Sequence, residues 1–439
     1  MAYKTFSGGI HPEDQKSYSK FSEIQQMPLP KKIVIPLSQH IGGLANPLVK
    51  VGDYVKTGQK IVEATGYVSI PMHASVSGTV TAIEYFPHPS GTDVVGIEIE
   101  SDDKDDWVEL IDDEDYLSLP NEEIRSRIHE AGICGMGGAG FPTVVKLTPP
   151  ADKPIDTVIV NGVECEPYLT ADCRLMVEEP NEIIAGLKIV MKLLDAQQGI
   201  IGIESNKPQS IKLLRQLTKN EKNIRVDALK LKYPQGAEKQ LIYATTKRKV
   251  PNKGGLPSSV GVVVDNVATI INIYEAVRYK RPLIERVVTV SGKIVRKPSN
   301  LLTRVGTKFS ELIEFCEGTI EAADKVIAGG PMMGNAICNL DAPTTKTVSG
   351  ILLLSKEEST LQEEQPCIRC ARCIDVCPSN LMPSLIASSV RNSDFETAEK
   401  AGVMDCMKCG CCSYVCPAHS KFIQWVEIGR QKILLNKKK

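Results

Sequence analysis

Aromatic residues are scarce in this 439-residue chain, at 5%, and no hydrophobic run is long enough to span a bilayer. The best candidate, residues 183–194, is short and contains Lys188 and Lys192. The N-terminus (MAYKTFSGGIHPEDQ) lacks the apolar core of a signal peptide. The net charge is −1, so no global field attracts nucleic acid. We therefore expect a chain that neither crosses a membrane by itself nor binds nucleic acid.

Cysteine is abundant by contrast. The chain has 14 cysteines, and nine of them fall between residues 367 and 416. Because no export segment is evident, a disulfide framework is disfavoured, and clustered cysteines are more typical of metal ligands. The length allows about two to four domains, so the cysteine-rich segment is expected to be one domain among several.

Eight of these cysteines form two runs with the same spacing, C-x2-C-x2-C-x3-C, each followed by proline. The runs are Cys367, Cys370, Cys373, Cys377 and Cys406, Cys409, Cys412, Cys416. This is the spacing of bacterial ferredoxins, in which three thiolates of one run bind a cluster and the fourth binds the other cluster. The pattern predicts two 4Fe–4S clusters. One is held by Cys367, Cys370, Cys373 and Cys416, and the other by Cys406, Cys409, Cys412 and Cys377.

Structural zinc is the alternative, because soft thiolates select zinc as well as iron–sulfur clusters. Zinc sites usually have two cysteine pairs separated by a longer loop, whereas here four cysteines occur in eleven residues, twice. Helical sequence between the runs predicts a helical two-cluster domain over residues 360–420. Cys411 lies outside the spacing and is expected to be a spare thiol. The scattered cysteines are expected to be small buried residues: Cys134, Cys165, Cys173, Cys316 and Cys338.

The remaining chain divides by its pattern. Short β-strands broken by Gly, Pro and Asp precede an acidic linker (SDDKDDWVELIDDED), which we expect to be a solvated spacer. Alternating helices and strands then predict an α/β layer with a parallel sheet, and a β-rich segment with one helix follows. The expected limits are 1–28 for a polar N-terminal extension, 29–101 for the first β domain, 118–282 for the α/β domain, 283–355 for the β-rich domain and 421–439 for a basic tail or helix.

Residues 135–140 (GMGGAG) satisfy the G-x-G-x-x-G pattern of dinucleotide-binding loops. That fingerprint requires a strand before the loop and a helix after it. Here a helix is predicted over residues 119–132, directly before the loop, so the ordinary Rossmann fingerprint does not apply. Taken alone, the loop could equally be a tight structural turn.

Four segments together resemble the flavin- and NADH-binding subunit of respiratory complex I. They are GMGGAGFPTVVKL, NGVECEP, YPQGAE and VDNVAT, in that family's order. The resemblance implies non-covalent FMN and NAD(H) binding. The backbone amides of the loop would approach the flavin, Lys146 would pair with its phosphate or ring, and two glutamates would lie near the nicotinamide as catalytic residues. The implied cofactor-binding residues are Gly135, Gly137, Gly138, Gly140, Lys146, Asn161, Glu164, Asn266 and Thr269, and the implied catalytic residues are Glu166 and Glu238. Val163 replaces that family's aspartate, and Met136 replaces an arginine.

Two further segments resemble known modules. VKVGDYVKTGQKIVEATGYVSIPMHASVSGTV has the turns of a biotinyl or lipoyl carrier domain, a barrel-sandwich hybrid. Tyr67 stands where a carrier needs lysine, so we expect a docking or shielding module and no swinging arm. Residues 286–354 resemble the soluble-ligand-binding β-grasp domain that follows the flavin domain in complex I.

The complete order, opening with GGIHP, resembles the RnfC family of the Rnf ion-translocating ferredoxin:NAD oxidoreductases. The resemblance implies a multidomain α/β and α+β protein: a barrel-sandwich hybrid, a Rossmann-like flavin/NAD domain, a β-grasp domain and a helical ferredoxin-type domain. It implies a peripheral protein on the cytoplasmic side of the cell membrane. Its partners would be the integral Rnf proteins and the iron–sulfur protein RnfB, with ferredoxin donating indirectly.

Electron counting gives the implied mechanism. Iron–sulfur clusters carry one electron at a time and NAD takes a hydride, so a flavin belongs between them. Two alternatives remain open. One is a soluble flavin and iron–sulfur reductase of another acceptor, such as a corrinoid reductase or a proline-reductase electron carrier. The other is a carrier or scaffold without redox turnover.

Overall fold

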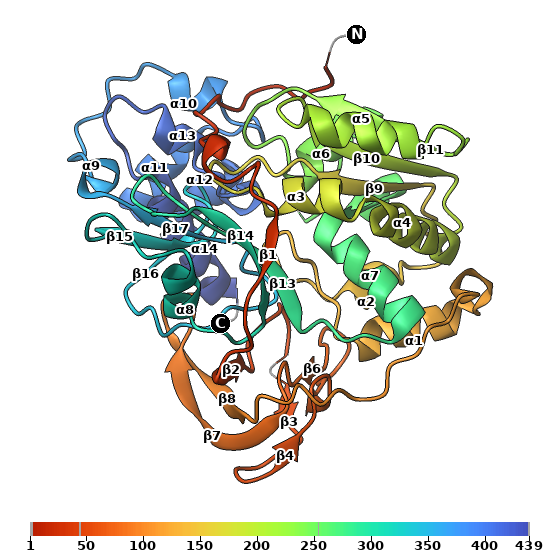
Figure 1. The fold of residues 1–439 in the computed structure, drawn as a ribbon. Coiled ribbons are helices and arrows are strands. Elements are labelled where there is room, and N and C mark those ends of the chain that lie inside the picture. Colours follow the sequence, from red (N-terminus) through yellow and green to blue (C-terminus); the bar gives the residue numbers. More distant parts are fainter. Residues whose placement is uncertain (1–2, 44, 253, 438–439) are drawn as a thin grey trace.

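The computed structural model describes residues 3–43, 45–252 and 254–437, and Figure 1 shows their fold. Within these residues no helix combines the length and apolar character needed to cross a membrane. Four domains follow one another along the chain, and an N-terminal segment runs past three of them. Short 3-10 helices add turns at η1 (Lys16–Tyr18), η2 (Tyr116–Ser118), η3 (Pro257–Val260) and η4 (Val403–Asp405).

The first domain is a sandwich of two antiparallel sheets, at the bottom of Figure 1. Alternating apolar residues of the strands meet between the sheets in one core, as the barrel-sandwich prediction requires. Tyr67 lies in the turn between β5 and β6 and is 70% exposed. The strands in sheet order are β2 (Lys32–Pro36), β8 (Asp93–Ser101), β7 (Gly78–Pro87), β4 (Tyr54–Val55), and then β3 (Asn46–Pro47), β5 (Lys60–Glu63), β6 (Met72–His73).

The acidic linker after β8 is tied to the protein rather than free. Asp105 pairs with Arg304 at 2.7 Å, and Asp113 pairs with Arg127 at 2.9 Å. Trp107 also lies under the guanidinium of Arg304. The expectation of a solvated spacer is therefore wrong, because several of its acidic side chains have basic partners elsewhere in the fold.

The second domain has a parallel sheet in the order β11–β10–β9–β12, which matches four consecutive strands (3-2-1-4) of a doubly wound fold. This confirms the Rossmann-like prediction. Helices α4 and α7 pack closely, because Gly186 has no side chain and a methyl group there would lie 2.2 Å from the Ile270 carbonyl oxygen. The strands are β9 (Thr157–Gly162), β10 (Gln198–Glu204), β11 (Ile224–Leu229) and β12 (Val262–Asn266), and the helices are α1 (Asn121–Glu130), α2 (Thr143–Lys146), α3 (Ala171–Glu178), α4 (Pro180–Leu194), α5 (Pro208–Leu217), α6 (Glu238–Thr246) and α7 (Val267–Tyr279).

The third domain is a mixed six-stranded sheet with helix α8 (Phe309–Phe315). Its edge strand β1 comes from the N-terminal segment and pairs in parallel with β14, as Figure 1 shows. Cys338 follows the opposite edge strand and is exposed, so its prediction as a buried residue is wrong, whereas Cys134 and Cys316 are buried. The strands in sheet order are β1 (Ile24–Gln26), β14 (Ser299–Arg304), β13 (Glu285–Ser291), β17 (Gly350–Leu354), β15 (Lys325–Ala328) and β16 (Asn335–Ile337).

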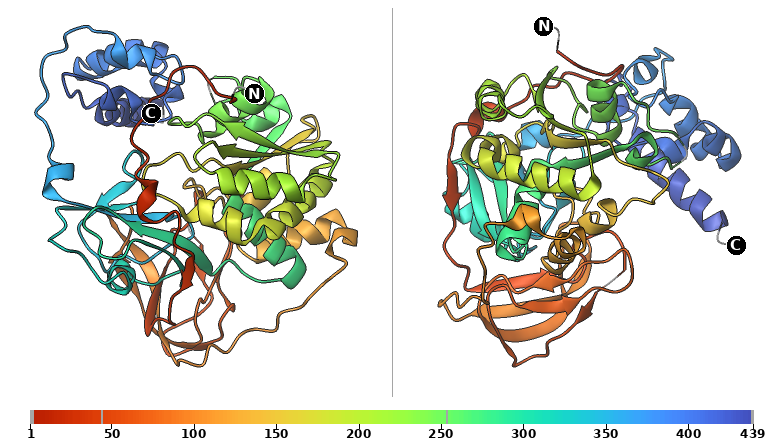
Figure 2. Two further views of the ribbon diagram at one scale, coloured as in Figure 1. Left: turned by 45° about the horizontal axis from the view of Figure 1, so that its top comes forward. Right: turned by 90° about the vertical axis from the view of Figure 1, so that its right-hand side faces the viewer.

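The fourth domain is helical, as predicted, and lies beside the second and third domains (Figure 2). The segment expected as a basic tail or helix forms α14, whose Val426 and Ile433 pack with Ile386 and Val390 of α11. A short α9 (Lys356–Ser359) begins with a capping box and precedes the domain. The helices of the domain are α10 (Arg372–Asp375), α11 (Pro383–Arg391), α12 (Phe395–Lys400), α13 (Cys411–Tyr414) and α14 (Phe422–Lys437).

Candidate functional site

The first candidate site lies at the carboxyl edge of the parallel sheet. Asn161 lies near the carboxyl end of β9, and it pairs in register with Asn266 on the neighbouring strand β12. A Cβ atom on Gly137 would lie 3.4 Å from the Asn266 Cβ, so the glycine loop covers the same edge. Because ligands of such folds bind outside the carboxyl ends of the strands, the predicted flavin residues gather where a ligand is expected.

The glycine loop presents open backbone at this edge. Helix α1 precedes it, as the sequence predicts, and the short α2 follows it. Gly137 and Gly138 are exposed, and a Cβ on Gly138 would meet no atom within 4 Å. Gly138 has φ +109° and Gly140 has φ +62°, conformations that favour glycine. The loop therefore leaves amide groups free for a ligand to approach.

Met136, which stands where the related family has arginine, has both of its backbone groups held from outside the loop. Its N–H donates to the Thr269 hydroxyl at 2.9 Å, and its carbonyl accepts from Arg286 at 2.7 Å. Arg286 is buried, and burial lowers its pKa to about 10. Thr269 thus acts on the loop through Met136, and Arg286 is a residue that the sequence did not indicate.

Thr269→Val tests this support. The substitution leaves the buried Met136 N–H without an acceptor, so we expect a loss of about 1–3 kcal/mol in the free energy of unfolding. We also expect weaker FMN binding. Chemical denaturation and flavin titration measure the two effects. Thr148→Val is the matched control, because that exposed hydroxyl, two residues after α2, bonds only the nearby Val144 carbonyl. A control loss equal to that of Thr269→Val would contradict the assignment.

Two buried carboxyl groups, those of Glu164 and Asp172, are linked to Asn266 by hydrogen bonds. The Asp172 N–H donates to Glu164 Oε1 at 2.8 Å, and Asn266 Nδ2 donates to Asp172 Oδ2 at 2.7 Å. Burial raises the pKa of Glu164 to about 7, with Lys16 opposing the rise. Glu164 Oε2 is buried and accepts no hydrogen bond from the described residues. Such an orphaned polar oxygen is the kind of group that a bound ligand satisfies.

Lys146 and Glu238 form a second polar group at the edge. Lys146 Nζ donates to the Val264 carbonyl at 2.5 Å and lies 3.3 Å from Glu238 and 3.4 Å from Asp265. Glu238 is 40% exposed, whereas the Asp265 side chain is 1% exposed and its Oδ2 has no hydrogen-bond partner in the described part of the chain. The positive charge of Lys146 therefore lies at the site, where the carboxylates of Glu238 and Asp265 already balance it.

Glu166 has partners different from those of Glu238. Its Oε2 accepts from the Met332 N–H at 3.0 Å, and burial raises its pKa to about 7. Met332 packs in a cluster with Tyr233, Cys409 and Cys411. Glu166 thus lies on the side of the site that faces the cysteine domain.

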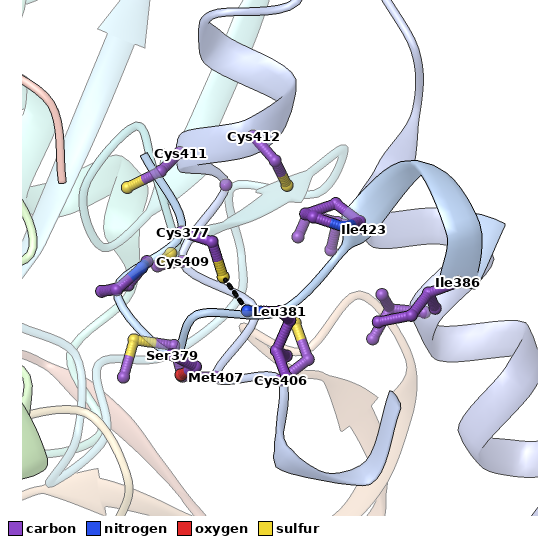
Figure 3. A pocket seen from close by; sticks show the side chains of 14 residues that line it. Cys377, Ser379, Leu381, Ile386, Cys406, Met407, Cys409, Cys411, Cys412 and Ile423 are labelled. Atoms are coloured by element: carbon purple, nitrogen blue, oxygen red, sulfur yellow. Dashed lines mark hydrogen bonds between the residues drawn. The ribbon is translucent and has the colours of Figure 1, made fainter. Parts of the chain in front are cut away.

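The second candidate site is a pocket in the helical domain. Cys377 from the first run lines it together with Cys406, Cys409 and Cys412 from the second. Figure 3 shows these side chains, with the Cys411 sulfur turned away from those of Cys377 and Cys412. Burial raises the pKa of Cys412 to about 12, and the nearby Cys406, Cys409 and Cys377 thiols add to the rise. The pocket brings together the same four cysteines that the spacing assigns to one cluster.

The other four cysteines are the ligands that the spacing assigns to the second cluster. Cys416 is close enough to Cys373 to add to the rise in its pKa that burial causes. Cys367 and Cys370 are exposed, whereas Cys409 and Cys412 are buried. We call the set of Cys367, Cys370, Cys373 and Cys416 the outer site, and the set of Cys406, Cys409, Cys412 and Cys377 the near site.

Both runs fold with the same backbone. The amide two residues after the first cysteine donates to its sulfur at 3.4 Å in each run, from Arg369 to Cys367 and from Lys408 to Cys406. The amide four residues after the last cysteine does likewise, from Leu381 to Cys377 at 3.3 Å and from Ser420 to Cys416 at 3.5 Å. N–H···S bonds of this kind tune iron–sulfur clusters. The repeat in sequence is thus a repeat in backbone geometry.

Sequence reasoning missed several charged residues at the flavin site. Lys207 Nζ donates to the Val163 carbonyl at 2.6 Å and lies 3.6 Å from Glu204. Lys16 Nζ donates to the Glu166 carbonyl at 2.8 Å. Both lysines are buried. Nothing in the sequence around Lys16 indicates burial, because its partners lie far away along the chain.

Comparison with protein families identifies four domains in the same order. Residues 4–104 match the RnfC barrel sandwich hybrid domain, and residues 128–275 match the Nuo51 FMN-binding domain. Residues 287–336 match the SLBB domain, and residues 360–417 match the 4Fe-4S dicluster domain. The two candidate sites lie in the second and fourth of these domains.

Three relatives that match over nearly the whole chain are C subunits of ion-translocating oxidoreductase complexes. The relative from the proton-translocating ferredoxin:NAD(+) oxidoreductase complex of Clostridium ljungdahlii is 46% identical, covering 96% of this chain and 93% of the relative. The relative from the Na(+)-translocating ferredoxin:NAD(+) oxidoreductase complex of Acetobacterium woodii is 42% identical, covering 100% of this chain and 99% of the relative. The relative from the ion-translocating oxidoreductase complex of Haemophilus influenzae is 41% identical, covering 99% of this chain and 67% of the relative.

Among solved structures, a chain of an NAD+-reducing [NiFe]-hydrogenase shares the fold. The TM-score is 0.50 at 16% identity, over 72% of this chain and 61% of the other. The order of the domains and the relatives that match over nearly the full length together show the family. The chain belongs to the RnfC family, the C components of ion-translocating ferredoxin:NAD+ oxidoreductase complexes.

Proposed function

We propose that this chain carries electrons between iron–sulfur clusters and NAD(H) through FMN, as the RnfC component of an ion-translocating ferredoxin:NAD+ oxidoreductase complex. The observation that carries the proposal is the contact between the two sites. Cys409 and Cys411 pack with Tyr233 of the flavin domain, and Met332 of the same cluster donates its N–H to Glu166. The near site is thus built against the flavin site.

The residues present fit both kinds of cofactor. Each set of four cysteines can supply the thiolates of one cubane cluster, with backbone N–H groups donating to four of the eight sulfurs. The sheet edge has open glycine backbone, and buried carboxylate oxygens of Glu164 and Asp265 there have no hydrogen-bond partner among the described residues. FMN bound there would supply the exchange between a hydride and single electrons.

The roles of individual side chains follow from their positions. We assign Gly135, Gly137, Gly138 and Gly140 to backbone contacts with FMN, and Asn161, Glu164 and Asn266 to its orientation. Lys146 would pair with the FMN phosphate or ring, and Glu166 and Glu238 would lie near the nicotinamide as catalytic residues, Glu166 on the side that faces the cysteine domain. Thr269 acts through Met136. The domain limits that go with these roles are 29–101, 118–282, 283–355 and 360–420.

The unequal exposure of the two cluster sites suggests an order. The near site is buried against the flavin domain, whereas Cys367 and Cys370 of the outer site are exposed together with Ile368, which is 68% exposed. Electrons would therefore reach external partners through the outer site. We propose that these partners are the iron–sulfur protein RnfB and the integral proteins of the complex at the cytoplasmic face of the membrane, with ferredoxin donating indirectly.

Anaerobic isolation of the full chain tests the cofactor content. We expect about eight iron and eight sulfide ions with one FMN per chain, since two cubane clusters need these numbers. A colourless protein containing zinc instead of iron would contradict the proposal.

Cell fractionation tests the place of the chain in a complex. We expect it to sediment with membranes and to become soluble when the genes of the partner proteins are deleted. A chain that stays soluble and fully active in both strains would instead support the alternative of a soluble reductase with another acceptor.

A further inference from the structure

The GGIHP segment joins the near site to the flavin domain. The Gly9 N–H donates to the Val376 carbonyl at 2.8 Å, directly before Cys377. Ile10 exchanges two backbone hydrogen bonds with Tyr233, at 2.8 and 2.9 Å. Two consecutive residues therefore bind the cysteine loop on one side and the flavin domain on the other.

The segment fits so tightly at this point that glycine is required. Gly8 and Gly9 both have φ +78°. A Cβ on Gly8 would lie 2.9 Å from the Cys377 carbonyl oxygen, and one on Gly9 would lie 2.6 Å from that of Tyr233. Ile10 is 4% exposed and packs with Tyr233 of the flavin domain and with Cys409 and Cys411 of the helical domain. The segment thus fills the boundary between the sites.

Both ends of this segment are anchored on the flavin domain. Lys4 pairs with Asp227 of β11 at 2.7 Å, and its backbone bridges to the same strand. Beyond the glycines, the Asp14 carbonyl accepts from the Tyr168 N–H at 2.9 Å. Lys16 then donates to the Glu166 carbonyl at 2.8 Å and lies 3.7 Å from Glu164. Its buried ammonium thereby holds the segment that carries two of the predicted flavin-site glutamates.

We propose that residues 4–16 form a positioning strap that sets the separation and orientation of the near site relative to the flavin site. This inference rests on the proposed function. Gly9 and Ile10 fix the loop of Cys377 against Tyr233, and Lys16 fixes the loop of Glu164 and Glu166. Because electron exchange needs both partners in a defined geometry, the Gly9 and Ile10 part of the strap governs the flavin-to-cluster step.

Gly9→Ala tests the strap, with Gly52→Ala as its matched control. Both glycines have positive φ, so the backbone strain is similar, but a Cβ on Gly52 would meet no atom within 4 Å. The full chain with its cofactors is mixed with NADH under anaerobic conditions. Stopped-flow absorbance follows flavin reduction, and freeze-quench EPR follows the clusters.

We expect normal flavin reduction in both variants and cluster reduction slowed about tenfold or more in Gly9→Ala only, as for other small misplacements of reacting groups. Hydrogen exchange of the cofactor-free chain gives an independent readout. The amides of Ile10 and Tyr233 should lose protection in Gly9→Ala and keep it in Gly52→Ala. Should Gly9→Ala fail to fold, Ile10→Ala takes its place with the same expectations.

The outcomes separate two failures. A wild-type chain whose clusters exchange no electrons with NAD(H) in either direction, neither reduced by NADH nor, when reduced beforehand, oxidised by NAD+, would overturn the proposed function itself. A wild-type chain that reduces them, with Gly9→Ala as fast as Gly52→Ala, would overturn the strap alone. Equal slowing of flavin reduction and cluster reduction would also overturn it, because a general structural defect would then explain the effect.

Discussion

Replacing Cys377 with serine is expected to remove the near cluster while the outer cluster remains. Cys377 belongs to the first run in sequence but lines the pocket of the second run, with Cys406, Cys409 and Cys412. Its own run is completed at the outer site by Cys416 instead. Loss of one ligand from a cubane site should cost that cluster, so iron should fall from about eight to about four per chain.

EPR of the reduced protein distinguishes the two clusters. Cys377→Ser and Cys412→Ser should delete the same signal, and Cys367→Ser should delete the other. Cys411→Ser is the control, because its sulfur is turned away from those of Cys377 and Cys412 (Figure 3), and it should keep both signals. Loss of one and the same signal in Cys377→Ser and Cys367→Ser would show that each run binds its own cluster, contrary to the crossover.

Gly137→Leu is expected to abolish most FMN binding. The glycine is exposed at the sheet edge, and its φ does not require glycine, so the backbone tolerates a side chain. The added Cβ would already lie 3.4 Å from the Asn266 Cβ, and the rest of the side chain would fill the space that the flavin needs. Overpacking of this kind costs about 1–3 kcal/mol, which lowers the affinity about tenfold to hundredfold.

Flavin titration of the deflavinated chain measures the change, with iron content as an internal control. The clusters are held by a separate domain, so the iron per chain should stay at the wild-type value. Wild-type FMN affinity in Gly137→Leu would place the flavin elsewhere and contradict the site at the sheet edge.

The cluster sites were predictable from the sequence because their signal is local. Identical spacing in two short runs predicts eight ligands, and the matched N–H···S bonds of Cys367 and Cys406 repeat the pattern in three dimensions. The parallel sheet was equally predictable, since each strand and helix of the second domain has its own periodicity. The glycine loop needed its neighbours Asn161 and Asn266 before its role could be inferred.

The residues that escaped prediction act over long distances along the chain. Lys16 reaches Glu164, and Arg286 reaches Met136, both from distant parts of the sequence. Lysine and arginine are rarely buried unless paired, so their residue types indicate surface positions. The pairing of β1 with β14 is similarly distant, and nothing in the polar N-terminal sequence indicates a strand there. Cys338 was misplaced because its exposure depends on lying beside an edge strand.

The central claim is that electrons pass between NAD(H) and the clusters of this chain through its own flavin. The most direct test is anaerobic EPR of the purified, cofactor-loaded chain after addition of NADH, with no partner protein present. We expect signals of reduced 4Fe–4S clusters that become weaker in Gly137→Leu, which binds less flavin. Clusters that stay oxidised with NADH and, when reduced beforehand, also stay reduced with NAD+ would contradict the account.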